Sequence, residues 1–147
     1  MTDIKEAKIK VDGYGDMIAA VTDTEMIFQR EIGSYQGEYI VVTRDESARY
    51  FFYIGSYGSC SGCDFLEGER DYDGFIEYKT ALDYVAESKP QYVMPAMLLK
   101  SLDTDLLHST IKGMFDSYDA DDFNIKDAAE LVKAVMEREA ITTTLSE

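Results

Sequence analysis

Two apolar runs on either side of a short polar stretch constrain the fold of this chain more than any other feature. EYIVVTR (residues 38–44) and ARYFFYIG (48–55) are rich in β-branched and aromatic residues, which favour strands. The polar residues DES between them suit a hairpin loop. The sequence therefore predicts an antiparallel hairpin over residues 38–55.

Helical periodicity follows the hairpin. Apolar residues recur at helical spacing from Phe75, through Tyr78 and Leu82 to Val85, and Pro95 suits the first turn of a short helix through Leu102. Two further apolar stripes predict helices, one with Leu107, Ile111, Met114, Phe115 and Tyr118, the other with Ile125, Ala128, Val132, Val135 and Met136. Strands before helices predict the α+β class: a small antiparallel sheet packed against a C-terminal helical layer.

The N-terminal part carries weaker patterns. Residues 7–11 alternate like a short strand, and the apolar residues of 16–29 are spaced as in a helix. A chain of 147 residues has the length of one ordinary domain, so we expect a single domain over residues 1–147.

The net charge of −15 comes from 29 acidic and 14 basic residues, and each third of the chain has an excess of acids. Such a surface repels phosphates, which argues against direct binding to nucleic acid or to an anionic membrane. The charge favours a basic protein surface as partner, although solubility alone explains it equally well. With no apolar run long enough to span a bilayer and no secretory signal in MTDIKEAKIK, we expect a cytoplasmic protein.

The only two cysteines, Cys60 and Cys63, form a CxxC in the loop SYGSCSGCD after the second run. A zinc site takes four ligands, of which this pair supplies half. Asp64 or Glu67 could add oxygen, or two chains of a homodimer could each lend a pair. Neighbouring carboxylates disfavour the reactive thiolate, so the favoured interpretation is a tight turn with two buried thiols, and zinc is the alternative.

No catalytic set accompanies the cysteines. His108, the only histidine, has no partner visible in the sequence, and we expect it half-exposed on a helix. Nucleophile elbows, phosphate-cradling glycine loops and HExxH are absent. The sequence therefore predicts a protein that is not an enzyme and has no cofactor.

The acidic stretch from Asp119 to Glu130 has the length of the twelve-residue calcium-binding loop of an EF-hand, and it has acidic residues at several ligand positions. Phe123 at the fifth position and Asn124 in place of the turn glycine break the pattern. Capping of the last helix by Asn124, with Asp127 three residues on, explains the stretch better.

The run REIGSYQGEYIVVTRD, followed by FFYIGSYGSCSGCDFLEG, resembles a group of small uncharacterised proteins of bacteria, archaea and their phages. These proteins pair a GSYQGEY strand start with a YGSCSGCD loop. The resemblance covers residues 30–68, and it implies a related fold and a phage setting without transferring any catalytic residue.

These observations predict an acidic protein–protein interaction module. Its specific form is a phage-encoded inhibitor of a nucleic-acid-binding host protein, with carboxylates in place of phosphates. The alternatives are a metal-binding or thiol-dependent module that uses Cys60 and Cys63, and a structural protein that self-associates. The predicted partner-binding residues are Glu67, Glu69, Asp71, Asp73, Asp119, Asp121 and Asp122, with the tyrosines Tyr39, Tyr53 and Tyr57 as a contact face.

Overall fold

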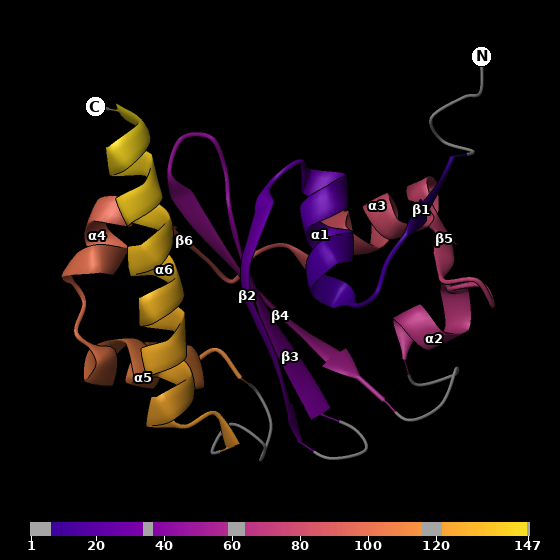
Figure 1. The fold of residues 1–147 in the computed structure, drawn as a ribbon. Helices are drawn as coiled ribbons and strands as arrows, with labels where there is room; N and C mark the ends of the chain where they lie inside the picture. Colours follow the sequence, from indigo (N-terminus) through magenta and orange to yellow (C-terminus); the bar gives the residue numbers. More distant parts are fainter. Residues whose placement is uncertain (1–6, 34–36, 59–63, 116–121, 147) are drawn as a thin grey trace.

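A four-stranded antiparallel sheet separates two helical layers (Figure 1). The computed structural model describes residues 7–33, 37–58, 64–115 and 122–146. Its elements in chain order are β1 (Lys8–Lys10), α1 (Tyr14–Thr22), β2 (Glu25–Gly33), β3 (Gly37–Arg44), β4 (Arg49–Tyr57), α2 (Phe65–Glu69), β5 (Phe75–Glu77), α3 (Tyr78–Ser88), β6 (Tyr92–Pro95), α4 (Ala96–Ser101), α5 (Thr104–Lys112) and α6 (Ile125–Ser146). The predicted α+β class is confirmed.

The sheet has the strand order β2-β3-β4-β6, so β2 and β6 lie at its edges. The predicted hairpin is formed by β3 and β4, in which Val41 pairs with Tyr53 and Arg44 with Tyr50. A separate ribbon pairs β1 with β5 antiparallel, which confirms the short N-terminal strand.

Two cores lie on opposite faces of the sheet. In β3, Ile40 and Val42 join the core beneath α4, α5 and α6, whereas Tyr39 and Val41 join the core beneath α1 and α3. Because both faces are covered, the strand is apolar at consecutive positions instead of alternating. The sequence predicted only the C-terminal layer, and the structure adds a second layer on the other face (Figure 1).

The predicted helix over residues 16–29 is wrong in its second half. Helix α1 ends at Thr22, and Asp23 takes the left-handed conformation with φ 54° at the helix C-terminus. Residues from Glu25 on then form β2, with Phe28 and Ile32 buried in the core beneath α6. Pairing with β3 therefore outweighs the local helical spacing.

The C-terminal helices form near the expected positions, but α5 ends at Lys112, so Met114 and Phe115 of the predicted stripe lie beyond it and Tyr118 lies outside the described residues. Some buried faces also differ. Phe75 belongs to β5, and in α3 it is Ala81 that is buried while Leu82 is exposed. In α6, Leu131 is buried between Ala128 and Val135. Two other members of the predicted α6 stripe are exposed: Ile125 and Met136. Among the described residues, no helix combines the length and apolar character needed to cross a bilayer.

Candidate functional site

Residues 64–77, called here the acidic segment, comprise α2, the turn after it and β5. Asp64 begins the segment as the N-cap of α2, and its Oδ1 accepts the N–H groups of Leu66 at 3.0 Å and Glu67 at 3.3 Å. Leu66 packs into the core beneath α1 and α3. The segment is thereby fixed to the α1 side of the sheet.

The one cation within the acidic segment points back toward the protein. Arg70 donates from Nη1 to the backbone carbonyls of Val11 at 3.1 Å and Asp12 at 3.0 Å. The Asp71 carboxylate accepts the N–H groups of Asp73 at 3.0 Å and Phe75 at 2.9 Å, and so closes the turn. The N–H of Phe75 and the nearby Lys8 lower the pKa of Asp71, which favours a charged carboxylate.

The outer side of the acidic segment presents carboxylates and one aromatic ring to solvent. Glu67, Glu69 and Asp73 are exposed, and they form no ion pair with any residue that the structure describes. Tyr72, between Asp71 and Asp73, has 104% relative exposure. Tyr72 was not among the tyrosines predicted from the sequence as a contact face, although its place between two aspartates indicates that its ring is exposed.

The same Asp64 joins the two described ends of the CxxC loop. Its Oδ2 accepts the N–H of Gly58 at 3.1 Å, and its Oδ1 accepts the Tyr14 hydroxyl at 2.6 Å. The residue is 9% exposed. Cys60 and Cys63 themselves lie outside the described residues.

The predicted tyrosine contact face does not form. Tyr39 and Tyr53 are 1% and 6% exposed and belong to the core beneath α1 and α3. Tyr57 is half-buried, and its hydroxyl donates to the carbonyl of Ile32 at 2.8 Å. The reason is the second helical layer, because it covers the face on which Tyr39 and Tyr53 lie.

Tyr39 is held in a close-packed aromatic cluster. Its ring stacks on Tyr14 with centroids 4.3 Å apart, and its hydroxyl lies 2.8 Å from that of Tyr84. A Cβ at Gly55 would lie 2.2 Å from the ring, so glycine is required on β4 where Tyr39 crosses it. The cluster fixes α1 and α3 to the sheet.

The buried tyrosines predict a steep loss of stability in alkali. Burial raises the pKa of Tyr39. Burial and the hydrogen bond to Asp64 raise the pKa of Tyr14. Burial and the hydrogen bond to Glu139 raise the pKa of Tyr50. At a pH just above about 10, the pKa of a tyrosine in the unfolded chain, the unfolded chain loses its tyrosine protons while the folded protein keeps them. The free energy of unfolding therefore has its full value below about pH 10 and falls as the pH rises further.

Parallel titrations by tyrosinate absorbance and circular dichroism check this expectation. The late part of the absorbance rise should coincide with loss of the helical signal. Full tyrosinate absorbance in a still folded protein would contradict it.

Of the second group of predicted acidic residues, only Asp122 is described, and it lies on the opposite layer. Asp122 is exposed just before α6, next to Phe123 in the core beneath α4, α5 and α6, whereas Asp119 and Asp121 lie outside the described residues. Asp122 and the acidic segment therefore do not share one surface.

The predicted capping of α6 is confirmed. Asn124 Oδ1 accepts the N–H of Asp127 at 3.0 Å, and Asp127 Oδ2 accepts the N–H of Asn124 at 3.0 Å. His108 is half-buried on α5, with Nε2 2.7 Å from the carbonyl of Phe123. It ties α5 to the start of α6.

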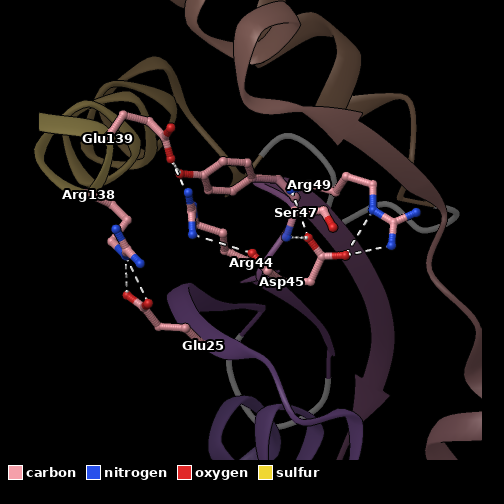
Figure 2. Close-up of polar contacts among 8 residues, drawn as sticks. Glu25, Arg44, Asp45, Ser47, Arg49, Arg138 and Glu139 are labelled. Carbon is pink, nitrogen blue, oxygen red and sulfur yellow. Dashed lines mark hydrogen bonds and ion pairs between the residues drawn. The ribbon is translucent and has the colours of Figure 1, made fainter. Parts of the chain in front are cut away.

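A buried ion pair joins α6 to the sheet (Figure 2). Arg44 Nε donates to Glu139 Oε2 at 2.8 Å, and the Tyr50 hydroxyl donates to the same oxygen at 2.6 Å. Arg44 and Glu139 are 7% and 8% exposed. Burial disfavours the charged carboxylate, but the hydrogen bonds from Tyr50 and Arg44 outweigh it and lower the pKa of Glu139.

Two more ion pairs flank the buried one. Arg138 on α6 meets both carboxylate oxygens of Glu25 on β2, at 2.8 and 2.9 Å. Asp45 accepts from Arg49 within the β3–β4 turn (Figure 2). Arg44, Arg49 and Arg138 each pair with a carboxylate. These ion pairs therefore stabilise the fold in this region.

Within the part of the chain that the structure describes, no three histidine, cysteine or acidic side chains converge as a metal ion would require. Cys60 and Cys63 fall outside that part, and so does the predicted zinc site. Comparison of the chain with protein-family models, curated proteins and solved structures gave no match.

Proposed function

We propose that this protein is an acidic interaction module that binds a basic protein surface through the acidic segment. The observation that carries the proposal is the exposure of that segment, in which the carboxylates of Glu67, Glu69 and Asp73 and the ring of Tyr72 are all open to solvent. Tyrosine supplies contact area at low entropic cost, and carboxylates select lysine and arginine. Arg70 is engaged with backbone carbonyls and Lys8 pairs with Asp71 at 3.6 Å, so neither cation pairs with Glu67, Glu69 or Asp73.

In its specific form, the partner is a nucleic-acid-binding host protein, and the module inhibits it. The carboxylates then occupy the places of phosphates and pair with the lysines and arginines that would contact nucleic acid. The net charge of −15 supports this form, because it accelerates encounter with a basic protein at low salt. The phage setting comes from the resemblance at residues 30–68.

The test is affinity capture from native or host lysate, with the wild-type chain and two variants. The first variant, Glu67→Gln/Glu69→Gln/Asp73→Asn, neutralises the acidic segment but leaves Asp71 to close the turn. The second neutralises three exposed glutamates elsewhere, by Glu46→Gln, Glu87→Gln and Glu137→Gln, so both variants have the same net charge.

We expect a basic, nucleic-acid-binding protein that is captured at low salt, released near 1 M salt, where the screening length falls to about 3 Å, and lost by the first variant alone. Capture that both variants support equally would exclude the acidic segment as the binding face. Capture undiminished at high salt would exclude the electrostatic mechanism.

A further inference from the structure

A pocket of about 330 Å³ lies beside the edge strand β2, at the N-terminus of α1. Its buried lining consists of Tyr14, Tyr39 and Val41, and its exposed lining includes Asp12 and Glu31. An apolar base next to carboxylates suits a ligand with an apolar stem and a cationic head.

Arg30 is the only cationic residue among those that line the pocket, and its charged group lies on the other face of the sheet. Arg30 contributes to the pocket, but its guanidinium pairs with Asp127 and Glu130 of α6. Neither Asp12 nor Glu31 forms an ion pair within the described residues. The charged side chains available to a ligand are therefore carboxylates.

The backbone donors that would attract an anion to this helix N-terminus are already used. The carboxylate of Asp16 accepts the N–H groups of Asp12 and Gly13, each at 2.8 Å. Gln29 Oε1 accepts the N–H of Gly15 at 3.2 Å. The N–H groups of Asp12, Gly13 and Gly15 are thus not free to bind an anion.

The pocket adjoins the acidic segment at Asp12. The guanidinium of Arg70 is bonded to the carbonyl of Asp12, whose residue lines the pocket. A basic partner lying on the acidic segment therefore meets the pocket at Asp12. Figure 1 shows α2 and the start of α1 on the same side of the sheet.

We propose that this pocket receives an arginine side chain of the basic partner. The stem lies beside Gln29 and the edge of Tyr14, over the enclosed Tyr39 and Val41, and the guanidinium pairs with Asp12 and Glu31. Arginine suits a partly buried site because its guanidinium is weakly hydrated and presents several donors in a fixed plane. This inference rests on the proposed function, since it names the side chain by which the basic partner is recognised.

The test is an NMR titration of the full chain with a blocked Gly-Gly-Arg-Gly-Gly peptide and its citrulline counterpart, which has the same shape without the charge. The arginine peptide should shift the amide signals of Gly13, Tyr14, Gln29 and Glu31, and the citrulline peptide should not.

Two variants test the location. Gly13→Leu fills the pocket without strain, because its backbone is extended with φ −163° and an added Cβ meets only Gln29 Oε1, at 3.8 Å. Asp12→Asn/Glu31→Gln removes the charges and is matched by Glu46→Gln/Glu87→Gln. We expect Gly13→Leu to abolish the shifts and the charge variant to weaken binding about five- to tenfold, with no change in the matched control.

The outcomes separate the pocket from the proposed function. Shifts confined to Glu67, Glu69 and Tyr72, unchanged in Gly13→Leu, would overturn the pocket assignment and leave the proposed function standing. No shift with the arginine peptide would also overturn the pocket assignment, while the salt-sensitive capture decides the proposed function. If Gly13→Leu does not fold, the charge variant and its control decide.

Discussion

Replacing Glu139 by alanine should lower the free energy of unfolding by about 3–5 kcal/mol, because it leaves the guanidinium of Arg44 buried without its carboxylate. It also leaves the Tyr50 hydroxyl without its acceptor. Urea denaturation followed by circular dichroism measures the loss. A change below about 1 kcal/mol would show that water reaches Arg44 and replaces the carboxylate.

Two further variants separate the contributions to this ion pair. Tyr50→Phe removes one hydroxyl and should cost about 1–2 kcal/mol. The double variant Arg44→Met/Glu139→Leu removes both charges, so it should be more stable than Glu139→Ala. A double variant less stable than the single one would contradict the view that the unpaired charge causes the loss.

The same ion pair gives stability a dependence on acid. Because the pKa of Glu139 is lowered in the folded protein, its contribution is complete above the unfolded glutamate pKa of about 4.3 and is lost as pH falls through the folded value. Glu139→Gln should therefore flatten the acid limb of the stability profile. An unchanged acid limb would assign acid unfolding to other carboxylates.

Replacing Asp64 by alanine is expected to cost about 2–4 kcal/mol, because one carboxylate serves several buried donors and the cap of α2. The N–H of Gly58 and the hydroxyl of Tyr14 would lose their acceptor, and the N–H of Leu66 would keep only the Tyr14 hydroxyl, at 3.4 Å. Thermal unfolding gives the loss in stability, and hydrogen exchange at Gly58 and Leu66 reports whether it is local.

Two conservative variants show how much of this loss of stability each hydrogen bond of Asp64 causes. Asp64→Asn keeps one oxygen and should cost less than alanine, whereas Tyr14→Phe removes one donor and should cost about 1 kcal/mol. Equal stability of Asp64→Ala and wild type, with unchanged exchange at Gly58, would mean that the loop ends are held by other contacts.

The sequence predicted the elements whose causes are local. The hairpin of β3 and β4 follows from β-branched and aromatic content around a polar turn, and the start of α6 follows from Asn124 and Asp127. The boundary between α1 and β2 was missed because it depends on the left-handed Asp23 and on pairing with β3, which is a tertiary effect.

The candidate binding face was predicted in part. The exposed carboxylates of residues 67–73 could be read from composition, since a dense run of charges cannot be buried. The fate of Tyr39 and Tyr53 could not, because it depends on where α1 and α3 pack. The pocket could not be predicted from the sequence either, because its lining combines Asp12 and Tyr14 with residues of strands that begin more than ten residues later.

Strand β3 makes the two helical layers interdependent. Its consecutive residues Ile40 and Val41 enter different cores, so detaching either layer exposes half of the strand to water. Neither core can therefore melt alone without destabilising the strand on which the other rests. The protein should unfold as one cooperative unit, so the surfaces of both layers are present together or lost together.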